Sequence, residues 1–160
     1  MATAARLVPA EPGLELITSG SAQAKEPLDL GDTPVGHRRI IMIAGGRFEG
    51  PRLNADVVPG GADWQIVHEG GWATLLARYT LRTDDGVLIS VVSSGVRHGP
   101  PDVLARIFTE HVDPREYYFR TAVSFETAEG TSYSWLNHIV AVSSGARSRD
   151  TVALSYYAVT

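Results

Sequence analysis

The segment Leu75–Val92, with the sequence LLARYTLRTDDGVLISVV, determines the fold class because it has the pattern of a β-hairpin. Apolar and polar residues alternate on both sides of the DDG turn, whose glycine can adopt the left-handed backbone conformation that such a loop requires. We expect Thr83 to pair with Val87, since this register collects the apolar side chains on one face. In that register Tyr79 points into the folded domain and Arg78 points away from it.

Similar β-rich runs continue along the chain on both sides of this hairpin, and each ends at Gly, Pro or Asp. Eight or nine strands joined by hairpin-sized loops favour an antiparallel sandwich or barrel, because parallel βαβ units need helix-length connections. We expect an N-terminal extension over residues 1–35, with a possible first strand at 14–18 followed by a loose connection, and a β domain over residues 36–160. The other predicted strands are 39–44, 52–58, 64–68, 74–83, 87–92, 117–127, 133–142 and 151–159.

One segment has helical spacing of its apolar residues. Asp102 follows Pro100-Pro101 and is a candidate N-cap, and Asp113-Pro114 ends the segment. The pattern predicts a helix of about nine residues that covers a barrel end or a sheet face. Its apolar side is formed by Val103, Leu104, Ile107 and Phe108.

A short internal repeat joins two distant parts of the chain. The sequence VSSGVR at Val92–Arg97 recurs as VSSGAR at Val142–Arg147, each time at the end of a predicted strand. We interpret the repeat as a strand-end device in which glycine relaxes the backbone at a bulge or barrel rim.

Composition excludes several classes of function. The 160 residues include no Cys, which removes disulfides, thiolate nucleophiles and thiolate zinc sites. The formal net charge of −4 argues against nucleic acid or an anionic membrane surface as partner, because both favour a basic face. No apolar run is long enough for a spanning helix, and Met1–Ala10 lacks the apolar run of a secretory signal. We therefore expect a one-domain cytoplasmic protein.

The chain resembles the domain of unknown function 3237 family over residues 34–160. The segments that carry the resemblance are Gly45–Leu53, Pro59–Trp64, Arg78–Gly86, Tyr118–Thr121, Phe125-Glu126 and Tyr133–Asn137, in the same order and spacing. The resemblance implies an antiparallel β-barrel of about this length and implies no particular activity. With the strand pattern it predicts an all-β protein: a single antiparallel β-barrel of about 8–10 strands with one short helix.

The chain also departs from the family pattern. Leu76 stands where similar members usually carry Asp, and His138 and Ser143–Gly145 replace a basic residue and a Gly-rich end. If that Asp has a chemical role in the family, this chain lacks the role or supplies the carboxylate from Asp63 or Glu126.

Motifs for metal, nucleotide and serine-nucleophile chemistry are missing from the sequence. The five His residues show no ligand-pair spacing, the Gly pairs lack a following Lys-Ser/Thr, and there is no Gly-x-Ser-x-Gly elbow. We expect neither a metal nor a cofactor.

The remaining candidates are acidic, phenolic, amide and guanidinium groups near strand ends. A carboxylate in a dry barrel lumen has its charged form disfavoured and is suited to proton transfer, while Tyr, Asn or Arg can stabilise a developing enolate. Candidate catalytic residues are Asp63, Glu126 and Tyr79, and candidate substrate-binding residues are Arg52, Trp64, Tyr118, Arg120, Tyr133, Trp135 and Asn137.

For several of these residues a structural role is the alternative. Arg120 and Glu126 share a strand face opposite Phe119, which would leave both in solvent. Tyr133 and Asn137 share a face if their segment is a strand, which favours a pocket wall.

Three functional hypotheses follow. The first is a cofactor-independent acid–base enzyme (isomerase, cyclase or lyase type) acting on a small aromatic or polyketide-like carbonyl compound, with a cavity of roughly 300 Å³ or more. The second is a non-catalytic carrier of a similar ligand, which predicts that no carboxylate reaches the lumen. The third is a structural module with a filled lumen and an exposed apolar patch. We also expect a homodimer, because Arg and apolar residues such as Leu88 share outer faces.

Overall fold

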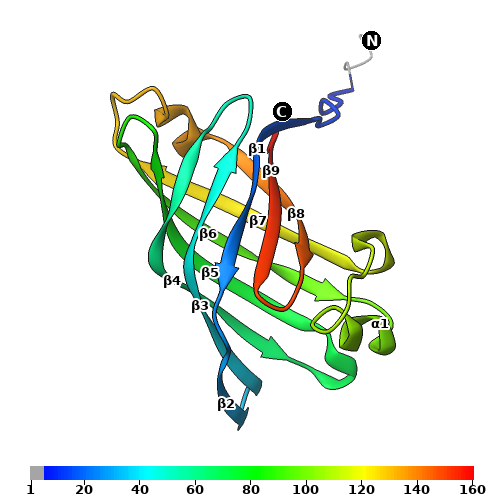
Figure 1. The fold of residues 1–160 in the computed structure, drawn as a ribbon. Helices are drawn as coiled ribbons and strands as arrows, with labels where there is room; N and C mark the ends of the chain where they lie inside the picture. The colour runs from blue at the N-terminus through cyan, green and yellow to red at the C-terminus, as the bar shows by residue number, and fades with distance from the viewer. Residues whose placement is uncertain (1–5) are drawn as a thin grey trace.

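The computed structural model describes residues 6–160, and the strands of this region form one antiparallel sheet that closes on itself (Figure 1). Strand β1 (Leu14–Ala24) pairs with β9 on one side and with β3 (Gly36–Glu49) on the other, so eight strands complete a barrel. Strand β2 (Leu28–Thr33) pairs with β3 alone and projects from the barrel. The predicted all-β barrel is confirmed. Its other strands are β4 (Ala55–Val67), β5 (Ala73–Thr83), β6 (Leu88–His98), β7 (Tyr118–Thr127), β8 (Val140–Arg147) and β9 (Thr151–Val159).

The β5–β6 hairpin has the predicted register. The Thr83 N–H donates to the Val87 carbonyl at 2.9 Å, and Gly86 has a φ of 87°, which a side chain would disfavour. Tyr79 is buried and Arg78 is exposed, as the alternation of apolar residues requires.

Strand β4 joins two segments, 52–58 and 64–68, that were predicted to be separate strands. The Pro59-Gly60-Gly61 segment, expected to end a strand, lies within β4, where the register against β5 shifts between Val58 and Ala62. Proline has no N–H for the ladder, and a bulge accommodates it without ending the strand.

The N-terminal region is more regular than expected. The loose connection predicted after residue 18 is wrong, because β1 continues to Ala24 and supplies the pairing with β3 that closes the barrel. Gly20 allows this approach, since a Cβ there would overlap Phe48. Strand β2 has no buried apolar face, since Leu28 and Leu30 are each 55% exposed, and it is too short for a clear period-two pattern.

The predicted helix is shorter than expected. Helix α1 (Pro101–Arg106) follows Pro100 and has six residues, and Asp102 lies in its first turn and does not cap it. Proline's fixed φ suits the first helical position, which moves the start ahead of Asp102. Val103 and Leu104 are buried as predicted.

The predicted strand over 133–142 is wrong in its first half. Residues Ser134–His138 form the 3-10 helix η3, stabilised by a hydrogen bond from the Leu136 N–H to the Tyr133 carbonyl at 3.0 Å, and β8 starts only at Val140. The side chains of this segment therefore do not share one strand face. Two further short 3-10 turns are η1 (Glu69–Gly71) and η2 (Pro114–Glu116).

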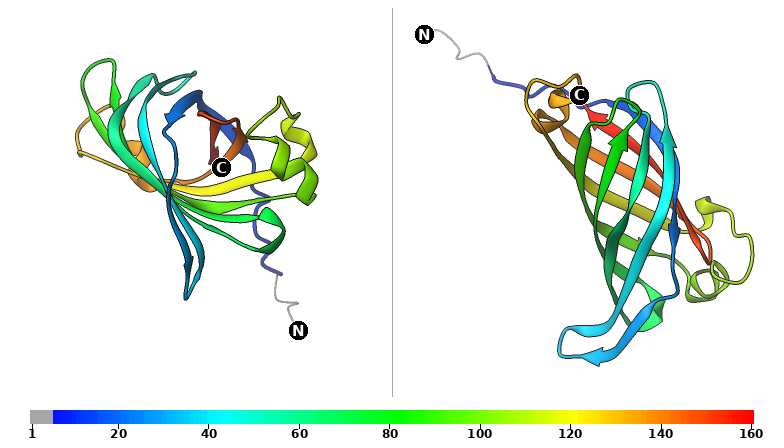
Figure 2. Two further views of the ribbon diagram at one scale, coloured as in Figure 1. Left: turned by 60° about the horizontal axis from the view of Figure 1, so that its bottom comes forward. Right: turned by 60° about the vertical axis from the view of Figure 1, so that its left-hand side comes forward.

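The barrel has two different ends (Figure 2). We call the end with α1, η1 and η2 the α1 end, and the opposite end, with the 3-10 helix η3, the η3 end. Toward the η3 end the lumen is filled by packed aromatic side chains: the Tyr156 ring lies 5.2 Å from Phe48 and 5.8 Å from Phe125. Within residues 6–160 no helix is long and apolar enough to cross a membrane.

Candidate functional site

A cavity of about 50 Å³ lies inside the barrel, in the half toward the α1 end. The expectation of roughly 300 Å³ is wrong, because large side chains from opposite walls occupy much of the lumen. The volume corresponds to about three or four water-sized groups. Its polar lining residues are Gln23, Asp63, Gln65, Tyr79, Ser93, Arg97, Thr121 and Arg147, and its apolar ones are Ala22, Ala24, Ile41, Ile43, Leu75, Ala77, Phe119, Val152 and Leu154.

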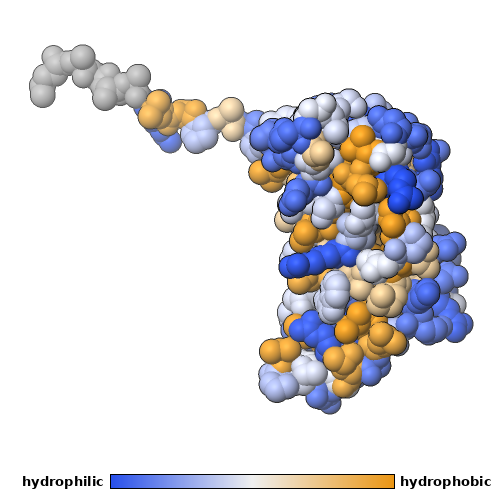
Figure 3. All heavy atoms as spheres, turned by 90° about the vertical axis from the view of Figure 1, so that its left-hand side faces the viewer, coloured by the Kyte–Doolittle hydropathy of each residue, from blue (hydrophilic) through white to orange (hydrophobic). Residues whose placement is uncertain are grey.

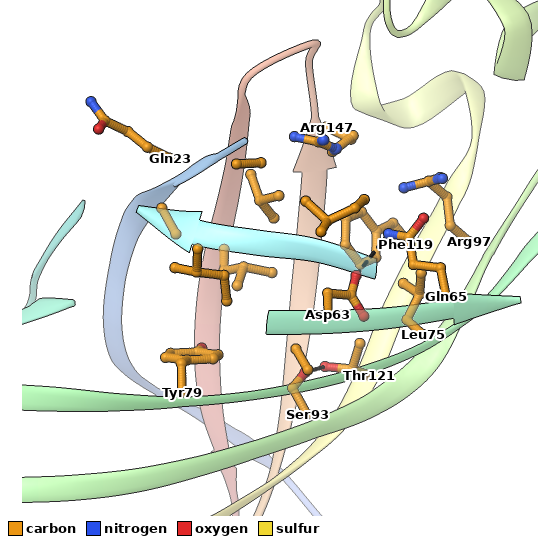
Figure 4. A pocket seen from close by; sticks show the side chains of 17 residues that line it. Gln23, Asp63, Gln65, Leu75, Tyr79, Ser93, Arg97, Phe119, Thr121 and Arg147 are labelled. Atoms are coloured by element: carbon orange, nitrogen blue, oxygen red, sulfur yellow. Dashed lines mark hydrogen bonds between the residues drawn. The ribbon is translucent and has the colours of Figure 1, made fainter. Parts of the chain in front are cut away.

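Asp63 supplies the cavity's carboxylate (Figure 4). It follows the β4 bulge and faces inward, where Oδ2 accepts a hydrogen bond from Gln65 Nε2 at 2.7 Å and Oδ1 accepts one from the Leu76 N–H at 3.1 Å. Burial raises the pKa of Asp63, and the Gln65 hydrogen bond and the charges of Arg97 and Arg147 partly oppose the shift. A carboxyl group of this kind accepts a proton more readily than an exposed aspartate.

Two arginines form the cationic side of the cavity. Arg97 on β6 is 2% exposed and Arg147 on β8 is 6% exposed. The Nε and Nη1 atoms of both side chains have no hydrogen-bond partner among the described residues. Burial and the positive charges of Arg147 and Arg39 lower the pKa of Arg97 to about 10. The Arg97 guanidinium therefore stays charged at neutral pH. The site therefore holds charged donors that lack acceptors.

A third arginine, Arg39, extends this cationic group toward the surface at the α1 end of the barrel. Arg39 Nη2 donates to Gln65 Oε1 at 3.1 Å, which links it through Gln65 to Asp63. The Phe108 ring, just after α1, packs against all three guanidinium groups, at 5.8 Å from Arg39, 5.4 Å from Arg97 and 5.7 Å from Arg147. One aromatic side chain thus covers the cationic end of the cavity.

The internal repeat builds two parts of the cavity wall, on β6 and β8, which flank β7. Ser93 and Ser143 both hydrogen-bond to Thr121 of β7, at 2.7 and 2.6 Å, and the arginine four residues after each serine lines the cavity. Gly145 is needed for space, because a Cβ there would lie 2.7 Å from the Phe119 ring. Its φ is not positive. The repeat therefore positions side chains, and interpreting it as a backbone device missed this role.

Tyr79 is the phenol of the cavity. Its hydroxyl is buried without a hydrogen-bond partner, and burial, assisted by the charge of Asp63, raises its pKa. The hydroxyl therefore stays protonated and can donate a hydrogen bond to a ligand.

Eight of the ten candidate residues do not line the cavity, and four of these eight lie on β4 and β7. Glu126 and Arg120 lie on the exposed outer face of β7, as their alternation with Phe119 indicated. Arg120 donates to the Phe119 carbonyl at 2.8 Å, and Tyr118 stacks on His98 at 4.8 Å. Trp64 is flanked in β4 by two residues that face inward, and it is absent from the lining.

The other candidates lie together at the η3 end, away from the cavity. The Arg52 guanidinium lies 3.6 Å from the Trp135 ring centroid and pairs with Glu15 at 3.3 Å. Asn137 Oδ1 accepts from the Thr127 N–H at 2.9 Å, and its Nδ2 donates to the Thr127 carbonyl at 3.0 Å. Tyr133 is half-buried against the core. These contacts hold η3 on the barrel. Both polar atoms of the Asn137 side chain are engaged in hydrogen bonds within the protein.

Of the predicted residues, the structure brings Asp63 and Tyr79 together in the cavity. Sequence reasoning missed Arg39, Gln65, Arg97 and Arg147. The repeated arginine, two residues after each repeated glycine, was the available signal, since residues two apart share a strand face. Within residues 6–160 no group of three His, Asp or Glu side chains is placed to hold a metal ion.

Comparison with known proteins gives relatives over nearly the whole chain. A UPF0311 protein of Clostridium acetobutylicum is 36% identical over 151 residues, which cover 93% of this chain and 95% of the relative. A UPF0311 protein of Rhodopseudomonas palustris is 37% identical over 140 residues, which cover 87% of this chain and 91% of the relative.

Solved structures confirm the fold. A β-barrel-like protein of Acinetobacter baumannii is 39% identical, with a TM-score of 0.85 over 97% of this chain and all of the other. A protein of unknown function from Rhodopseudomonas palustris is 34% identical, with a TM-score of 0.87 over 96% of this chain and all of the other. A structure described as an enzyme from Penicillium herquei shares the fold at 20% identity and a TM-score of 0.71, over 98% of this chain and all of the other. The model of the family described as protein of unknown function DUF3237 matches residues 12–159, and the chain belongs to this family.

Proposed function

We propose that this barrel is a cofactor-independent acid–base enzyme of isomerase, cyclase or lyase type, acting on a small carbonyl compound of aromatic or polyketide-like character. The observation that carries the proposal is the Asp63 carboxyl group, enclosed in the cavity with unpartnered donors of Arg97, Arg147 and Tyr79. The small volume implies that only the reacting end of the substrate enters the cavity.

The proposed step is proton abstraction next to a carbonyl. The carboxylate of Asp63 takes the proton, the carbon–hydrogen bond breaks, and its electron pair moves to the carbonyl oxygen as an enolate. A neutral Tyr79 hydroxyl or an arginine N–H donates a hydrogen bond to that oxygen. Return of the proton to another carbon of the enolate system gives an isomerase, and loss of a leaving group from the β-carbon gives a lyase. Attack of the enolate carbon on an electrophilic carbon of the same molecule, such as a second carbonyl, gives a cyclase.

A carboxylate inside the lumen supports this proposal over the carrier hypothesis. A carrier gains nothing from a buried carboxylate, whose desolvation costs free energy. That burial raises the pKa of Asp63, which makes its carboxylate a stronger base than that of an exposed aspartate. The occurrence of the fold in a protein described as an enzyme is compatible with the proposal.

Deuterium exchange tests the proposal without knowledge of the natural substrate. Pyruvate, acetone and acetophenone are incubated with the protein in D₂O, and loss of the α-proton signals is followed by NMR. We expect acceleration of at least one exchange reaction and a decrease of about 100-fold or more in Asp63→Asn. Glu126→Gln, which removes an exposed carboxylate on the outer face, is the matched control and retains the rate. Equal rates in Asp63→Asn and wild type contradict the proposal, as does exchange that is no faster than in buffer.

We also propose that the chain forms a homodimer through its outer barrel surface. Leu88 on β6 and Val140 on β8 are 53% and 67% exposed, and Figure 3 shows apolar side chains interspersed with polar ones on the barrel wall. Sedimentation at micromolar concentration should give twice the chain mass of 17.2 kDa. A single species of 17.2 kDa contradicts the dimer.

A further inference from the structure

We propose that Arg97 and Arg147 form a binding site for the carboxylate group of a singly charged organic ligand. The inference names the charge that the substrate of the proposed enzyme carries. It rests on the proposed function for the chemistry that follows binding, whereas the binding itself can be measured alone.

The charge balance of the α1 end supports an anion. Arg39, Arg97 and Arg147 bring three positive charges to this region, and among residues 6–160 Asp63 is the one carboxylate that lines the cavity. Among the described residues, neither Arg97 nor Arg147 has a carboxylate oxygen within salt-bridge distance. Buried charges in proteins are normally paired, because an unpaired buried charge destabilises the folded state. A singly charged anion would reduce the excess of positive charge in this region from two to one.

The unpartnered atoms show what kind of group is missing. Arg97 and Arg147 each leave Nε and Nη1 without an acceptor, so four charged nitrogen donors are available. Two carboxylate oxygens offer about four acceptor positions, which equals the number of these donors. The Tyr79 hydroxyl remains as a separate donor for an oxygen whose charge develops during the reaction.

The position of the two arginines suits capture of a ligand from outside. Arg97 lines the inner cavity and also a surface hollow of about 320 Å³ that contains Phe108 and Leu104. Arg147 lines the inner cavity and a second hollow of about 190 Å³ that contains His111 and Tyr117. Each arginine thus borders both the inner cavity and a surface hollow. Figure 4 shows both side chains on the side of the pocket away from Tyr79.

Size and charge favour a carboxylate over a phosphate. A cavity of about 50 Å³ holds a planar group of three heavy atoms more easily than a tetrahedral group of five. The Asp63 carboxylate in the same cavity also opposes a doubly charged ligand more strongly than a singly charged one. The remainder of the ligand would lie toward Phe108, whose ring can pack on an aromatic group.

Titration with simple anions tests this site. Isothermal titration calorimetry is carried out with acetate, benzoate and inorganic phosphate, and with benzamide as the uncharged analogue of benzoate. We expect benzoate to bind and benzamide not to bind at the same concentration. Arg97→Met and Arg147→Met should each weaken benzoate binding by about 10- to 100-fold, because each removes charged hydrogen bonds. Circular dichroism verifies that both variants remain folded.

The control is Arg78→Met, which removes the same charge from an exposed position on β5 and should leave benzoate binding unchanged. Equal binding of benzamide and benzoate, or wild-type affinity in Arg97→Met and Arg147→Met, overturns the inference. Tighter binding of phosphate than of benzoate overturns the choice of carboxylate.

The Asp63→Asn variant separates this inference from the proposed enzyme. It should bind benzoate at least as tightly as wild type, because a repelling charge is removed, while it loses deuterium exchange. Benzoate binding without any exchange in wild type contradicts the proposed function alone. Exchange of acetone as fast as that of pyruvate, with no decrease in Arg97→Met, contradicts the anion site alone.

Discussion

The two ends of the barrel use arginine and aromatic side chains in opposite ways. At the η3 end, Arg52 stacks on Trp135 and pairs with Glu15, so its charge is compensated at the surface. At the α1 end, Arg97 and Arg147 are buried beneath Phe108 and their Nε and Nη1 atoms lack acceptors. A polar group whose hydrogen bonds are complete stabilises the fold, whereas a buried one whose hydrogen bonds are missing retains binding capacity at a cost in stability.

The largest expected difference between the ends concerns Trp135. Trp135→Ala removes an aromatic side chain packed against the core and against Arg52, and we expect a loss of about 2–4 kcal/mol in the free energy of unfolding. Urea denaturation measures this loss, and benzoate affinity per folded molecule should not change. A variant of normal stability that no longer binds benzoate would place the binding site at the η3 end.

The opposite sign is expected at the α1 end. Arg97→Met replaces a buried, uncompensated charge by an apolar side chain of similar length, and we expect a gain of about 1–3 kcal/mol in unfolding free energy at neutral pH. The native pKa of Arg97 lies below its ordinary value, so this gain should decrease as the pH rises above about 10. Destabilisation by Arg97→Met in urea would show that the arginine supports the fold.

Asn137 provides an intermediate effect. Asn137→Ala removes two hydrogen bonds to the Thr127 backbone and one to Glu129, and should cost about 1–2 kcal/mol. Deuterium exchange at saturating substrate should remain at the wild-type rate. A decrease in exchange with unchanged stability would assign Asn137 to the reaction.

The smallest effect is a pH dependence caused by Asp63. Its native pKa is raised above 3.8, so its contribution to stability is present below that pH and is lost as the pH rises through the native value. The stability of wild type relative to Asp63→Asn should therefore fall with rising pH above 3.8, by at most about 1.4 kcal/mol per pH unit. Gln65, the Leu76 N–H, Arg97 and Arg147 oppose the shift and limit it. Denaturation curves of both proteins at successive pH values measure this slope. A stability of wild type relative to Asp63→Asn that rises with pH would contradict the raised pKa.

Much of the fold followed from local patterns. Period-two alternation around Gly86 predicted the β5–β6 register and the inward orientation of Tyr79, because both depend only on neighbouring residues. Strand β2 was missed because its pairing depends on β3 and not on an apolar face. The continuity of β4 through Pro59 was missed because a bulge is specified by the neighbouring strand β5.

The site was only partly predictable for a related reason. Asp63 and Tyr79 were identified from residue type and setting, but residue type alone also selected the η3-end group around Trp135. Arg97 and Arg147 could be recognised only once the alternation of β6 and β8 was counted from Ser93 and Ser143, which face inward. Whether a donor has an acceptor is a property of the assembled barrel, and no stretch of sequence contains it.

The most direct test of the account is a crystal structure of the protein soaked in benzoate. We expect density for the carboxylate within hydrogen-bonding distance of Arg97 and Arg147, with the ring directed toward Phe108. Benzoate bound beside Trp135 or Tyr133 at the η3 end, with the lumen empty, would contradict the account.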